Sequence, residues 1–149
     1  MRPMHKWDFR IRLLFIVAVI GAIFGFQPEK WLKAEIVIGP IDVYKVEQQH
    51  EEPLRASKWT EYEVSKILQS ITSMRASHYS QLPDKYLRFT FEREITLDHP
   101  AVPFVVRQMI VTLPDNRWDQ PDMLLQNPQG QWIAYETSHP LTMLIRDYQ

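Results

Sequence analysis

Polar and apolar positions divide the chain into one long apolar run and a remainder with short periodic patterns. The run is Ile11–Phe26 (IRLLFIVAVIGAIFGF), and its last fourteen residues carry no charge. A helix of that length covers about 21 Å, short of the roughly 30 Å hydrocarbon core of a bilayer. Trp7 and Trp31 flank the run, about 36 Å apart in a helix, which matches a full crossing with an aromatic ring at each headgroup level. The pattern predicts a transmembrane helix over residues 11–27.

The flanks of the run favour an uncleaved anchor over a cleaved signal peptide. Cleavage needs small residues in an A-x-A-like arrangement, and Phe24–Trp31 (FGFQPEKW) offers no such pair. Four basic residues precede the fourteen uncharged residues and two follow them, so the positive-inside rule places residues 1–10 in the cytoplasm. A cleaved signal and a buried soluble helix remain the alternatives. Gly21 and Gly25 have the spacing that lets two membrane helices approach closely.

The remaining residues, 34–149, carry patterns typical of one small domain. About 115 residues bury enough surface for a single core. Residues 35–46 predict one or two strands broken at Gly39–Pro40, because β-branched runs are typical of strands and Gly-Pro pairs of turns. The polar segment Gln48–Pro53 predicts a loop.

Two segments have the periodicity of a helix. The first covers about residues 60–75, where Thr60 predicts the N-cap and Glu63 completes a capping box. Its apolar stripe recurs at helical spacing and consists of Val64, Ile67, Leu68, Ile71 and Met74. The second helix is predicted after a capping Ser138, with a stripe formed by Leu141, Leu144, Ile145 and Tyr148.

Between these helices, the period of the apolar residues changes to two. Residues 86–97 alternate except at Arg93, which predicts a strand with a bulge or a sheet edge at that residue. Residues 104–113 are apolar on both faces, so we expect a central strand there. Residues 123–137 predict a hairpin with its turn at Asn127–Gly130, because Pro and Gly take the turn positions.

These patterns predict an α+β fold, with an N-terminal single transmembrane helix followed by a small domain. In that domain, two helices pack on an antiparallel sheet in the order β-α-β-β-β-β-α. Runs of adjacent strands flanked by helices favour this arrangement. The expected boundaries are a cytoplasmic tail at 1–10, a transmembrane helix at 11–27 and an extracytoplasmic domain at 34–149.

The distribution of charge narrows the classes of partner. Residues 1–33 carry six basic and two acidic side chains, whereas residues 34–149 carry eleven basic and sixteen acidic ones. A net-acidic domain is a poor binder of nucleic acid, because contact with phosphates needs a basic surface. The chain has no cysteine, which excludes disulfides and thiol catalysis. We therefore expect a membrane and a protein or envelope component as partners, and no nucleic acid.

Few residues offer catalytic chemistry. The five histidines show neither HExxH nor HxH spacing, and we expect His78, His99 and His139 to be loop and capping residues rather than metal ligands. Glu92 and Glu94 fall on an exposed face, which gives no shielded acid for hydrolysis. No nucleophile motif or phosphate-binding loop occurs. We therefore expect no catalytic residue, no cofactor and no metal.

Trp118 is the candidate contact residue. It stands in Asn116–Pro121 (NRWDQP), a segment of turn residues, whereas Trp59 and Trp132 fit a helix start and a strand. Aromatic side chains near polar loops anchor partners. The aspartates around Trp118 lack the glycine and terminal glutamate of a calcium loop, so we expect a solvated loop.

The sequence thus predicts a non-enzymatic, membrane-anchored domain that binds a protein or envelope component outside a bacterial-type cell membrane. One alternative is a small envelope hydrolase that uses loop His and Asp residues. It requires His99 or His139 within hydrogen-bond reach of a carboxylate inside a pocket. Another alternative is a secreted soluble binding module, which requires cleavage of the apolar run.

Overall fold

The structure, a computed structural model, describes residues 36–79, 81–116 and 118–148. The predicted tail at 1–10 and the predicted transmembrane helix at 11–27 lie outside these ranges. Within the described ranges, no helix is long and apolar enough to cross a membrane. Residues Glu35–Gln149 form one compact unit, which we call the domain.

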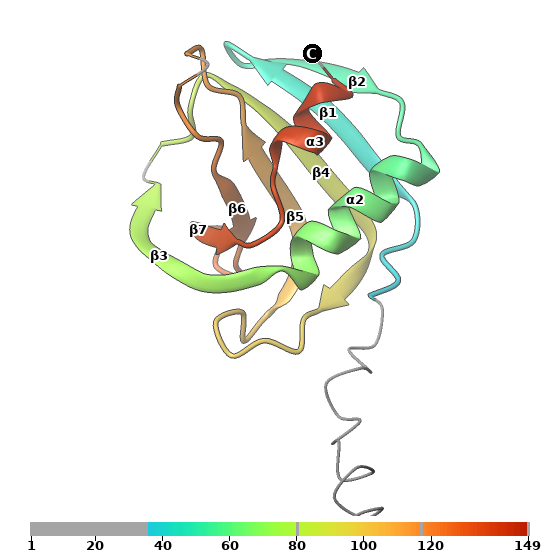
Figure 1. Cartoon of the computed structure of the whole chain (residues 1–149), viewed down its shortest axis with the longest axis vertical. Helices are drawn as coiled ribbons and strands as arrows, with labels where there is room; N and C mark the ends of the chain where they lie inside the picture. The colour runs from blue at the N-terminus through green and yellow to red at the C-terminus, as the bar shows by residue number, and fades with distance from the viewer. Residues whose placement is uncertain (1–35, 80, 117, 149) are drawn as a thin grey trace, which may run out of the picture. The chain divides into compact units, whose positions relative to one another are not determined.

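In the described part of the chain, seven strands form one antiparallel sheet with the spatial order β2-β1-β4-β5-β6-β7-β3 (Figure 1). The strands are β1 (Ile41–Glu47), β2 (His50–Leu54), β3 (Ile71–Tyr79), β4 (Lys85–Thr96), β5 (Val105–Thr112), β6 (Met123–Gln126) and β7 (Trp132–Thr137), and the helices are α2 (Lys58–Gln69) and α3 (Thr142–Arg146). An antiparallel sheet with two helices is therefore confirmed. The predicted order is wrong, because β2 and β3 are additional strands and the order is β-β-α-β-β-β-β-β-α.

Strand β2 replaces most of the loop predicted at Gln48–Pro53. Residues His50–Leu54 pair with β1 as an edge strand, and most of their side chains are exposed. An edge strand of this kind needs only backbone pairing on one side, so its sequence carries no apolar alternation. Gln48 and Gln49 make the turn with φ of 49° and 68°, as both central residues of a tight hairpin turn do.

Helix α2 begins earlier than predicted. Its N-cap is Ser57, whose hydroxyl accepts from the backbone N–H of Thr60 at 3.1 Å. The Thr60 hydroxyl accepts in turn from the backbone N–H of Ser57 at 3.1 Å. Thr60 therefore takes the third position of the capping box, and the prediction of a Thr60–Glu63 box is wrong. A capping box can close with two hydroxyl side chains as it does with a hydroxyl and a carboxylate.

Helix α2 also ends earlier than predicted. The hydroxyl of Ser70 donates to the carbonyl of Ile67 at 2.8 Å, and the chain leaves the helix at this residue. Ile71 and Met74 fit the helical stripe but belong to β3. A hydroxyl that competes for the last carbonyls ends a helix, and the β-branched pair after Ser70 favours a strand.

The two long strands follow the sequence pattern closely. The register of β4 against β5 shifts between Thr90 and Ile95, which confirms an irregularity in the segment that contains Arg93. The side chain of Arg93 is exposed. Strand β5 lies between β4 and β6, as expected of a strand that is apolar on both faces. The β6–β7 hairpin is confirmed, and its turn residue Gly130 has a φ of 80°.

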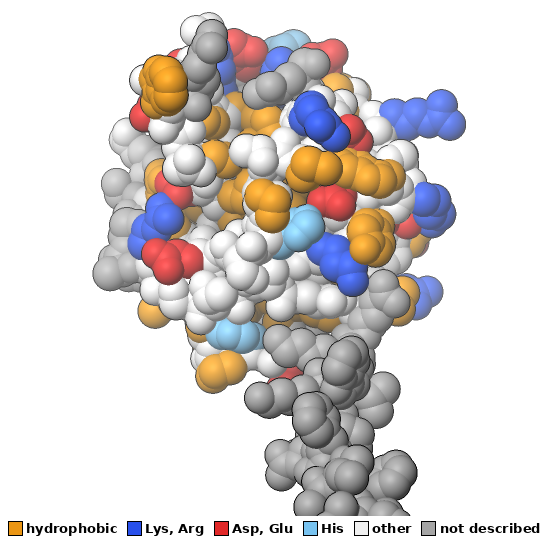
Figure 2. All heavy atoms as spheres, viewed as in Figure 1, with side chains coloured by type: hydrophobic (Ala, Val, Ile, Leu, Met, Phe, Trp, Pro, Cys, Tyr) orange, Lys and Arg blue, Asp and Glu red, His pale blue; other side chains and the backbone are white. Residues whose placement is uncertain are grey.

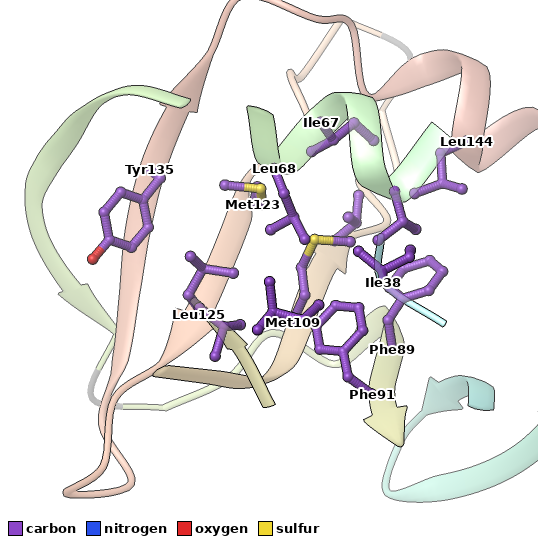
Figure 3. Close-up of a cluster of buried hydrophobic side chains, with 14 of the residues drawn as sticks. Ile38, Ile67, Leu68, Phe89, Phe91, Met109, Met123, Leu125, Tyr135 and Leu144 are labelled. Carbon is purple, nitrogen blue, oxygen red and sulfur yellow. The ribbon is translucent and has the colours of Figure 1, made fainter. Parts of the chain in front are cut away.

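One face of the sheet carries the main core, and both helices cover it (Figure 3). Side chains from six strands, all but β2, meet those of α2 and α3 there. Figure 3 labels Phe89, Phe91, Met109, Met123, Leu125, Tyr135, Ile67, Leu68 and Leu144 among them. The helical stripe at the C-terminus is confirmed, since Leu141, Leu144 and Ile145 are buried in this core.

Helix α3 is shorter than the sequence predicts. It begins at Thr142 with Leu141 at the N-cap position, and no side chain caps it. The hydroxyl of Ser138 donates instead to the carbonyl of Ser70 at 3.3 Å. Capping by Ser138 is therefore wrong, because this hydroxyl joins the β7–α3 connection to the end of α2.

The opposite face of the sheet carries a smaller cluster. Ile110, Leu124 and Ala134 are buried there under side chains that include Tyr79, Leu82, Tyr86 and Trp132. The connection from β3 to β4 contributes to this cover, because β3 lies at one edge of the sheet and β4 lies toward the other. It ends at Lys85, whose carbonyl accepts from the N–H of Leu113 at 3.0 Å. This contact places the β3–β4 connection beside the start of the β5–β6 loop.

Candidate functional site

The loop between β5 and β6, residues 113–122, carries the most exposed aromatic side chain of the described chain. Trp118 is 81% exposed. We call residues 113–122 the Trp118 loop. It leaves the sheet at the end where β1 turns into β2, and the described chain begins at the opposite end (Figure 1). The exposure expected for Trp118 is thus found, and its role as a contact residue stays a prediction.

A lysine braces the start of the Trp118 loop. The Lys85 Nζ lies 2.8 Å from Asp115 Oδ1 and 3.3 Å from Glu47 Oε1. The hydrogen bond to Asp115, followed by the one to Glu47, raises the pKa of Lys85 above its ordinary value. All three side chains reach solvent, so this brace orients the loop more than it stabilises the fold.

The loop turns back on itself directly before Trp118. The side-chain oxygen of Asn116 accepts from the backbone N–H of Trp118 at 3.1 Å. The carbonyl of the same residue accepts from the N–H of Asp119 at 3.0 Å. An asparagine that bonds to the backbone two residues on mimics a turn, which fixes the course of the chain at the tryptophan.

The end of the loop is held by Asp122. Its carboxylate accepts hydrogen bonds from Arg75 Nη1 and from the hydroxyl of Tyr79, both on edge strand β3. The hydrogen bond to Asp122, followed by burial, raises the pKa of Tyr79 to about 12. The N–H of Asp122 also donates to the hydroxyl of Thr112 at 2.8 Å. These contacts attach the loop to β3 and to β5.

A hollow of about 240 Å³ lies next to the base of the loop. The side chains that line it include Tyr79, Asp84, Lys85, Thr112 and Asp115. It is bounded by two carboxylates and one ammonium group, and that ammonium group is already shared between Asp115 and Glu47. The hollow therefore has an acidic surplus.

His139 is the one histidine, among the described side chains, that bonds to a carboxylate. Its Nε2 lies 2.9 Å from Oε2 of Glu63, whose side chain is only 7% exposed. Glu63 belongs to α2 and His139 to the β7–α3 connection, so the pair ties these two segments together. His139 also lines a cleft of about 420 Å³ with Arg75, Asp122 and Glu136. In the described part of the chain, no serine or threonine hydroxyl bonds to the His139 side chain.

The other candidates of the sequence do not gather into a site. His99 Nδ1 accepts from the N–H of Ala101 at 3.2 Å, as a loop residue does, and His78 lies in β3. Glu92 and Glu94 are exposed, and Glu94 pairs with Arg107. Among the described residues, no group of three or more histidine, aspartate or glutamate side chains is placed to hold a metal ion.

The remaining described tryptophans and the face of the sheet that the helices cover do not indicate a binding site. Trp59 is half-buried at the start of α2, and Trp132 packs against the smaller cluster. On the face that carries both helices, charges of both signs intermingle with hydrophobic side chains (Figure 2). This face therefore presents a mixed surface in the described residues, which singles out no ligand.

Sequence reasoning misses the residues that hold the loop and the histidine. Arg75 and Tyr79 lie 47 and 43 residues from Asp122, and Lys85 lies 30 residues from Asp115. Glu63 lies 76 residues from His139. No local pattern encodes such pairs, because each depends on which strands become neighbours in the sheet.

No family model matches the sequence, and neither a curated protein nor a solved structure matches it.

Proposed function

We propose that residues 34–149 form the extracytoplasmic binding domain of a membrane-anchored envelope protein, and that the Trp118 loop contacts a protein partner. The observation that carries the proposal is a tryptophan, 81% exposed, on a loop that polar contacts hold at both ends. The proposed activity is binding without catalysis.

The free energy gained by covering the side chain of Trp118 is large enough for it to anchor a partner. Covering about 200 Å² of apolar surface on a tryptophan corresponds to about 5 kcal/mol before the costs of association. Those costs include the ordering of loops at the interface. The contacts of Asp115, Asn116 and Asp122 already order this loop, so a partner meets it close to its bound shape.

The place of the loop in the domain also suits a tethered protein. The described chain begins at Ile36, at the end of the sheet opposite to the Trp118 loop (Figure 1). A domain tethered through its N-terminal side leaves the opposite end free for a partner. The tether itself is the transmembrane helix expected at residues 11–27.

Photocrosslinking in intact cells tests the proposal. A benzoylphenylalanine at position 118 of the full chain is expected to give a discrete crosslinked species. The matched control places the same residue at Tyr62, which is 50% exposed on α2. Equal crosslinking at both positions, or none at position 118, would contradict the proposal.

The membrane anchor is tested separately. The chain has no cysteine, so a single cysteine at Asp119 can be labelled alone. An impermeant maleimide is expected to label it in intact cells, and the mature protein is expected to keep its N-terminal segment by mass spectrometry. A mature chain that starts after residue 26 would make the protein a secreted binding module instead.

A second candidate function, a small envelope hydrolase, is favoured by one observation. The buried carboxylate of Glu63 bonds to His139, which lines a cleft, and a carboxylate in that position orients a histidine for use as a base. Hydrolysis of ester and peptide probes that is lost in both His139→Ala and Glu63→Gln would support it. If the variants change only the midpoint of unfolding, the contact between Glu63 and His139 has a structural role alone.

A further inference from the structure

We infer that the partner segment bound by the Trp118 loop is basic, and that it places a lysine or arginine side chain against Trp118 and its neighbouring carboxylates. The inference rests on the function proposed above and adds the chemistry of the partner. It is carried by two independent observations, the state of the exposed aromatic rings and the balance of charge around the loop.

The rings of half-buried Tyr44, exposed Tyr62 and exposed Trp118 differ in what covers them. The guanidinium of Arg88 lies 4.9 Å from the ring centre of Tyr44, and the Lys66 ammonium lies 5.1 Å from that of Tyr62. Among the described residues, no lysine or arginine lies over Trp118. Indole is the aromatic side chain that attracts cations most strongly. Two weaker rings are thus covered by cations of the chain itself, whereas no lysine or arginine in the described ranges covers the indole of Trp118.

The charge around the loop is acidic. Asp84 and Asp119 are exposed, and neither carboxylate bonds to any side chain in the described ranges. Lys85 is shared between Asp115 and Glu47. By sequence, the Trp118 loop holds three aspartates and one arginine. A cationic segment is attracted to this end of the sheet, whereas an acidic segment or an anionic surface is repelled.

The hollow beside the loop offers a place for one long side chain. Its volume of about 240 Å³ corresponds to about eight water molecules, and Asp84 and Asp115 line it. A lysine or arginine that enters it replaces water with charge-assisted hydrogen bonds. A second lysine or arginine of the same segment then lies against the indole of Trp118.

Fluorine NMR on the full chain in zwitterionic nanodiscs tests the inference. The chain has five tryptophans, so 5-fluorotryptophan labelling gives five signals, and Trp118→Phe assigns the one from Trp118. A seven-residue peptide of alternating lysine and leucine is expected to shift this signal. The same peptide with glutamate in place of lysine is expected to leave it unchanged. Raising the salt from low to high concentration is expected to lower the affinity for the lysine peptide at least tenfold.

Variants link this binding to the carboxylates. The double substitution Asp84→Asn with Asp119→Asn is expected to lower the affinity for the lysine peptide at least threefold. The matched control is Glu92→Gln, an exposed carboxylate on β4, which is expected to leave the affinity unchanged. Equal binding of both peptides, or no shift of the Trp118 signal, would overturn the inference. The crosslinking result at position 118 does not depend on these peptides, so a failure here leaves the proposed function standing.

Discussion

The two loops that flank β5 are held by opposite kinds of interaction. The β4–β5 loop, residues 97–104, is held by burial, since Leu97 and Val102 are 5% and 2% exposed in the main core. The hydroxyl of Tyr135 donates to the carbonyl of Ala101 at 3.1 Å and joins that loop to β7. The Trp118 loop is held by charged and polar contacts, and its largest side chain is in water.

This difference separates the demands of folding from those of function. The apolar residues of the β4–β5 loop complete the core, so folding explains them. Trp118 is 81% exposed and buries little surface in the domain, so folding does not explain why this position carries the largest side chain. The four substitutions below test that separation, each measured on the full chain in mild detergent.

Leu97→Ala is expected to have the largest effect, a loss of about 3 kcal/mol in the free energy of unfolding. Leu97 is buried in the main core, and its truncation leaves a cavity there. Urea unfolding followed by circular dichroism measures the loss. The matched control is Val105→Ala at the first residue of β5, directly after this loop, where the side chain is 36% exposed and the loss is expected to be below about 1 kcal/mol. Equal losses would mean that the loop is not part of the core.

Asp122→Asn is expected to cost less, about 1 kcal/mol, because it weakens the hydrogen bonds to Arg75 and Tyr79 at the protein surface. It is also expected to lower the pKa of Tyr79 from about 12 toward its ordinary value of 10, since the bond to Asp122 is the main cause of the raised pKa. Carbon-13 NMR of labelled tyrosine follows the phenol directly. The control Asp119→Asn removes the same charge and is expected to leave the pKa of Tyr79 unchanged.

The same contact gives a dependence on pH with a defined sign. The folded state holds the Tyr79 proton more tightly than the unfolded state, whose pKa is near 10. Its contribution to stability is therefore complete below pH 10 and is lost as the pH rises toward 12. Over this window the wild type is expected to lose more stability than Asp122→Asn. An equal loss of stability in both proteins would show that the contact with Asp122 is not the cause of the raised pKa of Tyr79.

Local spacing predicted the parts of the fold that depend on neighbours in sequence. The alternation at 86–97 predicted β4 correctly, because one face of that strand lies in the core. The turn residues at Asn127–Gly130 predicted the hairpin whose second strand is β7. Trp118 was expected in water because turn residues surround it. The end of α2 was predicted wrongly, because Ile71 continues the helical spacing while the Ser70 hydroxyl ends the helix.

The rest depends on partners that lie far apart in sequence. Strand β2 is held by backbone pairing to β1, which leaves no trace in the apolar pattern. The contacts of Lys85, Asp122 and His139 appear only when the order of strands in the sheet is known. The candidate site therefore consists of one residue that the sequence singles out, Trp118, and of polar contacts around it that depend on the order of the strands.

Asn116→Ala is expected to have a smaller effect on stability, a few tenths of a kcal/mol, because the hydrogen bond it removes is exposed. Its effect is expected to be local. The amides of Trp118 and Asp119 should exchange with solvent several-fold faster, since the turn that orders them is lost. Hydrogen exchange followed by NMR measures this, with the exposed Gln120→Ala as the control in the same loop. Unchanged exchange at Trp118 would show that the Asn116 turn does not order the loop.

Trp118→Ala is expected to have the smallest effect on stability, within about 0.5 kcal/mol, although it removes more atoms than any other of these substitutions. The side chain is 81% exposed, so its loss opens no cavity. Val102→Ala in the β4–β5 loop is the matched comparison, because it removes only two methyl groups from a residue 2% exposed and is expected to cost about 2 kcal/mol. Urea unfolding of both variants, beside crosslinking yield from a benzoylphenylalanine at Asp119, gives both readouts. A loss of crosslinking in Trp118→Ala with unchanged unfolding assigns the tryptophan to a partner, because a residue that folding requires cannot be removed without a change in the unfolding free energy. A loss of more than about 1.5 kcal/mol would show that Trp118 packs against the domain, and the contact would lose its basis.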